Sequence, residues 1–184
     1  MAEADAEAMR AAALPDRLRL RRNRRFGLIL ALLVFAIDQA AKWVVTNPLQ
    51  LEFRQSIELT PFYNLTFVRN NGVSLGLLSA DSEIGRWLLV AMTAAIAIFV
   101  AIWLWREKRR DDSFALALVL GGALGNIVDR VRLGYVLDYS DLHFGEWRPF
   151  LVFNVGDAAI TIGVLLLLVR ALLMRDGRAK KKEA

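Results

Sequence analysis

Four aspartates lie within or beside long apolar stretches of the chain: Asp38, Asp129, Asp138 and Asp157. A carboxylate in the hydrocarbon core of a membrane costs ~2.5–3.5 kcal/mol on insertion scales, so an acid at that depth is a functional candidate by default. Two carboxylates held together in a poorly solvated site cannot both ionise cheaply, so one keeps its proton while the other can take one from water. An aspartyl protease uses such a pair to activate water and to protonate the leaving amine.

Asp138 and Asp157 differ from the other two acids in their neighbours. Neither has a basic residue three or four positions away, and each ends a flexible, small-residue context, LGYVLDY and FNVGD. They are therefore the pair that we expect to carry out chemistry. A scaffolding role and a direct chemical role stay equally open for the other polar residues at this depth, which are Asp38, Lys42, Asn126, Asp129 and Arg130, because such groups satisfy buried carboxylates by hydrogen bonds and ion pairs.

Composition removes most other chemistries. The chain has no cysteine and one histidine, His143, which leaves little material for thiolate, zinc or Ser-His catalysis. We expect neither a metal nor a cofactor. Lys42 could form a Ser-Lys dyad, but its apolar block contains no serine. The net charge of +5 comes from basic clusters beside apolar blocks, without nucleic-acid-binding motifs, so we expect no nucleic-acid partner.

Four helical spans are needed to position these acids. Apolar blocks at about 26–45, 87–105, 113–130 and 152–174 each approach the ~20 residues that cross a ~30 Å hydrocarbon core. The predicted fold class is a membrane all-α bundle of four transmembrane helices. Residues 1–25 form a basic extension before this domain of residues 26–174, and residues 175–184 form a basic tail.

Basic residues indicate how the bundle is oriented. Sixteen Lys and Arg residues lie in the two tails and between the second and third spans, against six near the other two connecting segments. By the positive-inside rule both termini are cytoplasmic, and segments 46–86 and 131–151 face outward. Asp38 then lies about 18 Å along its outward-running helix, Asp157 lies about 9 Å below the outer start of the last span, and Asp129 closes the third span. The acids therefore converge on the outer half of the bilayer.

The outer segments contain two further patterns. LEFRQSIEL alternates apolar and polar residues from Leu51 to Leu59 and is followed by NLTFVR, so we expect a small extracytoplasmic β element. Amphipathic aromatic residues in the second outer segment are predicted to settle at headgroup level; they are Tyr135, Tyr139, Phe144, Trp147 and Phe150.

Four blocks of sequence resemble those of one known family. DQAAKWVV, NLTFVRNNGVSLGLL, GGALGNIVDRVRLGYVLDYSDL and FNVGDAAITIG occur in the order and spacing of lipoprotein signal peptidase, or signal peptidase II, over roughly residues 35–165. The resemblance implies an aspartic endopeptidase of the bacterial inner membrane, with its site toward the outer leaflet. Such an enzyme removes the signal peptide from diacylglyceryl-modified prolipoproteins, just before the lipid-modified cysteine. Its partners would be this substrate, membrane lipids and the cyclic peptide inhibitor globomycin, and we expect a monomer.

The resemblance also assigns roles to residues. It implies that Asp138 and Asp157 are the catalytic dyad. Residues that support the dyad or bind the substrate would be Asn70, Gly72, Asn126, Arg130 and Asn154. Structural polar residues would be Asp38, Lys42 and Asp129. Three positions depart from the usual family pattern, namely Leu75, Tyr139 and Gly156.

Two functions from other classes remain as alternatives. A small proton- or cation-coupled transporter would use buried acids to bind its ions, although the absence of an evident internal repeat argues against it. A scaffolding membrane subunit would use every polar residue to join helices. The convergence of the acids with the GNIVDR and FNVGD motifs favours the peptidase.

Overall fold

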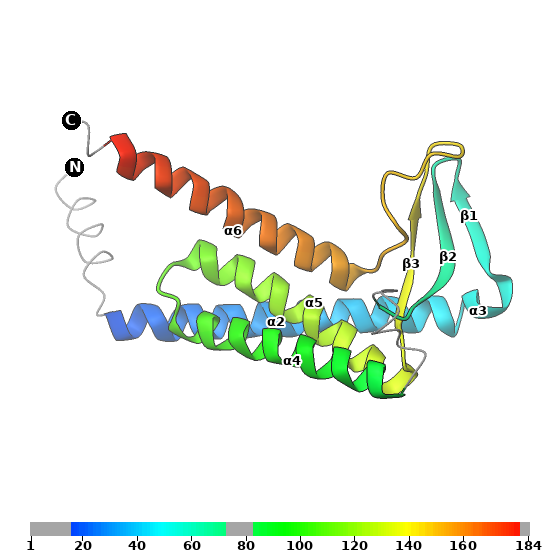
Figure 1. Ribbon diagram of the computed structural model, residues 1–184, viewed down its shortest axis with the longest axis horizontal. Helices are drawn as coiled ribbons and strands as arrows, with labels where there is room; N and C mark the ends of the chain where they lie inside the picture. The colour runs from blue at the N-terminus through cyan, green and yellow to red at the C-terminus, as the bar shows by residue number, and fades with distance from the viewer. Residues whose placement is uncertain (1–15, 73–82, 181–184) are drawn as a thin grey trace, which may run out of the picture.

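The computed structural model describes residues 16–72 and 83–180, which form a bundle of long helices with a small sheet at one end (Figure 1). The long helices are α2 (Asp16–Thr46), α4 (Glu83–Arg106), α5 (Arg110–Leu133) and α6 (Val155–Lys180). All four contain stretches long and apolar enough to cross a membrane. A short helix, α3 (Leu51–Arg54), and three strands, β1 (Ser56–Thr60), β2 (Tyr63–Asn70) and β3 (Val136–Leu142), make up the rest of the regular structure in these ranges. Leu75 lies outside the described residues.

Helix α5 is the centre of the bundle. Its apolar stretch is 56% buried, whereas those of the other three helices are 28% buried or less and carry large apolar side chains on the surface. Close approach of its neighbours depends on small residues. A Cβ on Gly122 would meet the carbonyl oxygen of Gly156 on α6, and a Cβ on Gly125 would meet the carboxylate of Asp38 on α2. Glycine at these two positions therefore lets both helices pack against α5.

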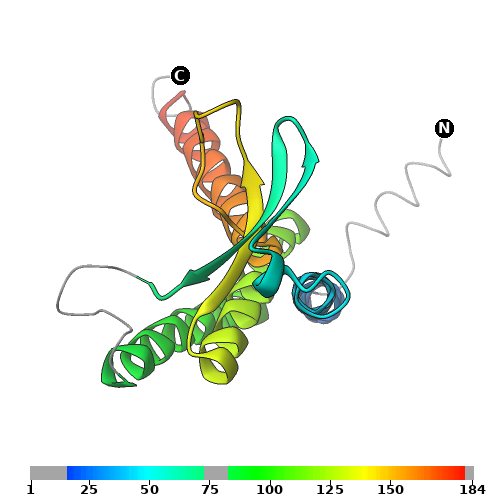
Figure 2. The ribbon, with the colours of Figure 1, turned by 90° about the vertical axis from the view of Figure 1, so that its right-hand side faces the viewer.

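The segments between α2 and α4 and between α5 and α6 contribute to one antiparallel sheet with the order β1-β2-β3. Figure 2 shows the three strands lying side by side across the end of the helices. The register pairs Val68 with Asp138 and Asn70 with Val136, after an irregularity between Leu65 and Val68. The predicted β element is confirmed, and β3 extends it into a segment for which no strand was predicted.

Two local predictions were wrong. Residues Leu51–Arg54 are helical, although their alternation predicted a strand. A strand would place Leu51 and Phe53 on the same face, whereas the helical turn buries Leu51 completely and leaves Phe53 83% exposed. Tyr139 does not lie at the surface, because its side chain packs with Leu51, Leu65 and Leu137 in a small core beneath the sheet. Phe144, Trp147 and Phe150 are exposed, as expected.

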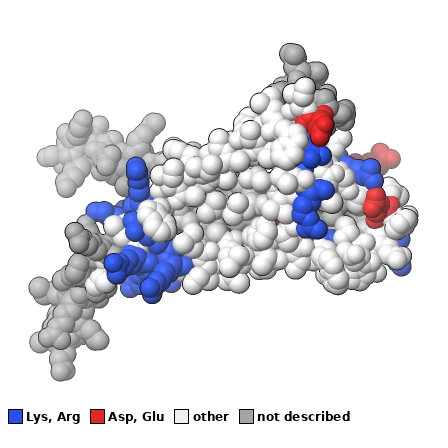
Figure 3. All heavy atoms as spheres, turned by 90° about the horizontal axis from the view of Figure 1, so that it is seen from below, with Lys and Arg blue, Asp and Glu red and all other residues white. Residues whose placement is uncertain are grey.

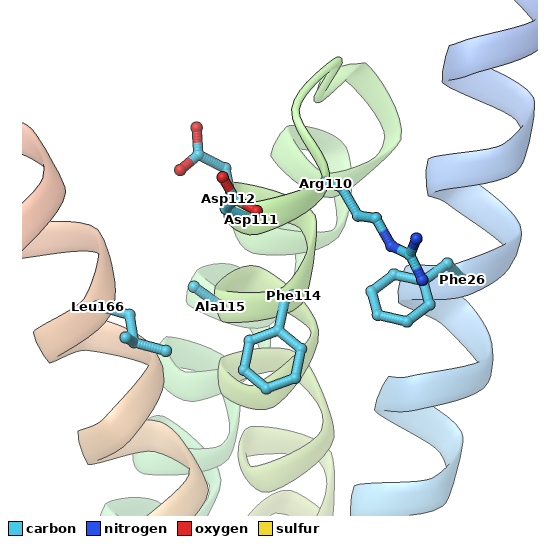
Figure 4. A pocket seen from close by; sticks show the side chains of 7 residues that line it. All are labelled: Phe26, Arg110, Asp111, Asp112, Phe114, Ala115 and Leu166. Atoms are coloured by element: carbon cyan, nitrogen blue, oxygen red, sulfur yellow. The ribbon is translucent and has the colours of Figure 1, made fainter. Parts of the chain in front are cut away.

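The end of the bundle opposite the sheet is rich in Lys and Arg (Figure 3). Arg24 of α2 donates to the carbonyl of Trp105 at 2.6 Å and stacks on its ring, and Arg170 of α6 forms an ion pair with Asp112 of α5. A hollow at this end is lined by Phe26, Arg110, Asp111, Asp112, Phe114, Ala115 and Leu166 (Figure 4). Arg110 covers the ring of Phe26 there, so these charged groups mainly join the helix ends.

Replacing Gly122 with alanine should destabilise the bundle. The new Cβ would overlap the Gly156 carbonyl oxygen and push the start of α6 away from α5, at a cost of about 1–3 kcal/mol, as is typical of overpacking. Thermal unfolding in detergent measures this loss. Leu124→Ala is the control, because that side chain is partly exposed on the same helix. A Gly122→Ala variant as stable as the parent would contradict the close α5–α6 contact.

Candidate active site

Asp157 is held by the turn that starts α6. The carbonyl of Asn154 accepts the first helical hydrogen bond, from Ala158, which makes Asn154 the N-cap residue. The Asn154 Oδ1 atom accepts the Asp157 N–H at 2.8 Å, and the Asp157 Oδ2 atom accepts the Asn154 N–H at 3.2 Å. This reciprocal pair is a capping box. It fixes the Asp157 carboxylate at a helix N-terminus, where the helix dipole favours negative charge.

Asp138 is held by strand β3 and by two amides. The Nδ2 atom of Asn70 donates to its Oδ2 at 2.9 Å, and the Nδ2 atom of Asn154 donates to its Oδ1 at 2.6 Å. Gly72 orients the first amide, because its backbone N–H donates to Asn70 Oδ1 at 2.9 Å. Gly72 has a φ of 91°, a left-handed conformation that favours glycine. Asn70 and Gly72 therefore act on Asp138 together.

Asn154 connects the two carboxylates, because its backbone N–H donates to Asp157 and its side-chain Nδ2 donates to Asp138. Asp138 is only 2% exposed. Burial raises the pKa of Asp138, and the negative charge of Asp157 raises it further, while hydrogen bonds from Asn70 and Asn154 oppose the rise; the resulting pKa is about 7. Asp138 therefore keeps a proton over a pH range in which an ordinary aspartate has lost it.

A polar cluster next to the pair joins four elements, α2, α5, α6 and β3. The Lys42 ammonium lies 2.7 Å from Asp38 Oδ2 and 2.7 Å from Asp129 Oδ2. The other oxygen of Asp38 accepts the Gly156 N–H at 2.8 Å, so Asp38 ties α2 to the first turn of α6. Asp129 Oδ2 accepts the Leu137 N–H at 3.2 Å and so ties α5 to β3. Each of these carboxylates thus holds the backbone next to one member of the pair.

Asn126 and Arg130 lie on α5 at the same level. Asn126 donates from Nδ2 to Asp157 Oδ1 at 2.8 Å. The Arg130 Nε atom is buried and has no hydrogen-bond partner among the described residues. Arg130 and Asn126 also line a cavity of about 200 Å³ together with Thr93 of α4 and Ile160 of α6. Every site residue that the sequence suggested therefore lies in or next to one cluster.

Some of the contacts in this cluster had no assigned role in the sequence analysis. Gln39 donates to Asp129 Oδ1 at 3.1 Å, and the backbone N–H groups of Leu137 and Gly156 hold carboxylates. The spacing Asn154-x-x-Asp157 was a readable signal, since it is that of a capping box. The backbone contacts leave no comparable mark in the sequence.

An apolar groove adjoins Asp157 at the start of α6. Its volume is about 240 Å³, and it is lined by Phe150, Leu151, Phe153, Asp157, Ala158, Thr161 and Ile162. Leu151 is 90% exposed. An apolar chain could therefore reach the Asp157 carboxylate from the side of the bundle.

Comparisons with known proteins agree with this geometry. A family model described as signal peptidase (SPase) II matches residues 30–173. The chain belongs to this family. It is 56% identical over 160 residues to a lipoprotein signal peptidase of Sphingopyxis alaskensis, an alignment that covers 86% of this chain and 92% of the relative. A lipoprotein signal peptidase of Rhizorhabdus wittichii is 56% identical over 154 residues, covering 84% of this chain and 90% of the relative.

A solved structure of a bacterial membrane enzyme, determined by the in meso method at 1.9 Å resolution, has the same fold. It is 30% identical to this chain, with a TM-score of 0.68, and the match covers 80% of this chain and 92% of that one. The chain is thus an aspartic peptidase of the signal peptidase II type and a multi-pass membrane protein. This family membership supports neither of the alternatives, the transporter and the scaffolding subunit.

The raised pKa of Asp138 predicts a pH dependence of stability. The unfolded chain releases this proton near the ordinary aspartate pKa, whereas the folded chain keeps it up to about pH 7. The stabilisation is therefore complete below about pH 4 and is lost as pH rises through 7. Asp138→Asn removes this pH-dependent stabilisation. The melting temperature of the variant, relative to that of the parent, should therefore rise as pH increases from 4 to 8. A constant difference between the two proteins would contradict the raised pKa.

Proposed function

We propose that Asp138 and Asp157 form the catalytic dyad with which this chain cleaves the signal peptide from diacylglyceryl-modified prolipoproteins, just before the lipid-modified cysteine. The observation that carries the proposal is the position of Asn154, hydrogen-bonded to both carboxylates. The side-chain amide of Asn154 donates to Asp138 and its backbone N–H donates to Asp157, so one residue holds both acids at one reaction centre. The relatives cited above are named for lipoprotein signal peptidase activity, which supports the substrate class.

The two acids have different tasks in this proposal. Asp157 accepts hydrogen bonds from Asn126 Nδ2 and the Asn154 N–H at the start of α6, so it is the ionised base. Asp138 holds the one proton that the pair retains, because its pKa is raised to about 7. Water attacks the carbonyl carbon of the scissile peptide and gives its proton to Asp157. Asp138 then gives its proton to the departing nitrogen as the C–N bond breaks.

The remaining site residues support this reaction. Asn70, Gly72 and Asn154 aim Asp138, and Asn126 aims Asp157. The unpartnered Nε of Arg130 suits a substrate carbonyl oxygen, because a buried N–H gains most from an acceptor that arrives with the ligand. Asp38 and Asp129 hold the backbone around the dyad.

The apolar groove beside Asp157 suits a substrate that stays in the membrane. Its lining and its exposed rim favour an acyl chain or an apolar signal segment over a polar peptide. Globomycin, as a cyclic peptide inhibitor of this family, would compete for the same surface. One chain supplies all of the residues named in the dyad and its supports, which is consistent with a monomer.

The orientation in the membrane is part of the proposal. The Lys- and Arg-rich end of the bundle in Figure 3 carries the start of α2, the end of α6 and the α4–α5 connection. The positive-inside rule places that end in the bacterial cytoplasm, together with both termini. The sheet and the dyad then lie toward the outer leaflet of the inner membrane, at the depth where the lipid-modified cysteine is anchored.

Asp138→Asn and Asp157→Asn should each abolish cleavage while leaving the protein folded. Either change removes a group that holds or takes a proton, so we expect turnover to fall about 10³-fold or more. The assay is cleavage of a diacylglyceryl prolipoprotein by purified enzyme, with and without globomycin.

Asp141→Asn is the matched control for both variants. Asp141 is also buried on β3, but it pairs with Arg148 at 3.1 Å and with Thr66 at 3.2 Å, outside the dyad. It should keep cleavage activity per folded molecule. Full activity of Asp138→Asn or Asp157→Asn would remove that residue from the dyad.

The proposed roles also predict a pH profile. Since Asp138 must hold a proton to act as the acid, kcat/KM should fall as pH rises through about 7. The decline should approach tenfold per pH unit on the basic side. A profile of kcat/KM measured between pH 5 and 9 checks this, and activity that is flat or rising from 7 to 9 would refute Asp138 as the acid.

A further inference from the structure

Lys42 contacts a third group, the Asn126 side chain, in addition to the two carboxylates of its ion pairs. An ammonium group has three N–H donors. Lys42 Nζ donates to Asp38 Oδ2 at 2.7 Å and to Asn126 Oδ1 at 3.2 Å, and it forms an ion pair with Asp129 Oδ2 at 2.7 Å. The Lys42 side chain is buried, so these three groups surround its ammonium inside the protein. A lysine paired with two carboxylates is a cation and cannot serve as the base of a Ser-Lys dyad.

The third contact determines which way the Asn126 amide points. Asn126 Oδ1 accepts hydrogen bonds from Lys42 Nζ and from Asn154 Nδ2, both at 3.2 Å. Its Nδ2 is therefore directed at Asp157 Oδ1, at 2.8 Å. A flipped amide would place its N–H groups against the Lys42 ammonium and the Asn154 amide, and its oxygen against the Asp157 carboxylate. Without Lys42, one of the two donors that enforce the observed orientation is gone.

We propose that Lys42 is a positioning residue of the peptidase reaction, whose ammonium group holds the Asn126 oxygen and so aims the Asn126 N–H at Asp157. This inference rests on the proposed catalytic dyad. It separates Lys42 from Asp38 and Asp129, which hold backbone. Lys42 acts on the reactive carboxylate through one amide, and it does not touch the substrate.

The expected consequence is a change in the pH profile. When the ammonium is lost, the Asn126 amide is free to turn its oxygen toward Asp157. This change disfavours the ionised base, so the acid limb of kcat/KM should move to higher pH. The other charged or titratable groups around this cluster are Asp38 on α2, Asp129 and Arg130 on α5, and Asp138 and Tyr139 on β3.

The test uses Lys42→Met in the full chain, assayed with the diacylglyceryl prolipoprotein and normalised to folded protein. We expect kcat to fall on the order of 100-fold, KM to stay within about twofold, and the acid limb to shift upward. Lys42→Gln is the second variant, because its amide can still donate to a buried carboxylate and so favours folding if Lys42→Met does not accumulate. The same acid-limb shift is expected, since the two N–H donors of a glutamine amide can serve Asp38 and Asp129 but leave none for the Asn126 oxygen.

Arg170→Met is the matched control. It removes a cation from another partly buried ion pair, that with Asp112 at the basic end of the bundle. It should lower the melting temperature while kcat and the pH profile per folded molecule stay unchanged. A purely structural Lys42 would behave in the same way.

A double-mutant cycle with Asn126→Ala tests the route of the effect. If Lys42 acts through Asn126, adding Lys42→Met to Asn126→Ala should lower kcat by no more than about twofold. Multiplicative losses, or a folded neutral Lys42 variant with kcat within twofold of the parent and an unshifted acid limb, would overturn the proposal. Failure of the dyad itself would appear separately, as activity in Asp138→Asn or Asp157→Asn.

Discussion

The ion cluster of Lys42, Asp38 and Asp129 is the constraint on which the rest of the site depends. One ammonium lies 2.7 Å from each of two carboxylates, deep in the bundle. Such charges are tolerable away from water only when they are paired and hydrogen-bonded, and removing one partner of a buried pair costs about 3–5 kcal/mol in general. The free lone pairs of the two carboxylates are satisfied by backbone N–H groups of α6 and β3. The need to satisfy the charges therefore brings together the elements that carry Asp157 and Asp138.

Three asparagines position the dyad, and each does so in the same way. Each amide oxygen accepts a hydrogen bond from a fixed donor: the Gly72 N–H for Asn70, Lys42 for Asn126 and the Asp157 N–H for Asn154. With its oxygen engaged, each amide presents its NH₂ group to an aspartate of the dyad. A hydroxyl could rotate between partners, whereas an amide with an anchored oxygen can aim its donors in one direction only.

The sequence predicted the helices and the convergence of the acids better than it predicted the sheet. Long apolar blocks have one stable solution in lipid, so the four spans follow from composition. The strand that carries Asp138 was not predicted, because VLDYSDL is buried on both sides and lacks the alternation of a surface strand. Its pairing with β2 joins residues 68 positions apart, as in the contact of Asn70 with Asp138, and no local pattern encodes such a distance. The assignment of Asp138 therefore depended on the family resemblance, while that of Asp157 could also be read from its capping motif.

The secondary structure that carries each acid explains why two chemically identical side chains would behave differently. Asp157 lies in the first turn of a helix, where free N–H groups and the helix dipole favour negative charge. Asp138 lies on a buried strand, which has almost no net dipole, so burial dominates and raises its pKa. Placing both acids on helix N-termini would favour two negative charges that repel each other. A strand opposite a helix start instead gives one site for a proton and one for a charge, which is the asymmetry that general acid–base cleavage of a peptide requires.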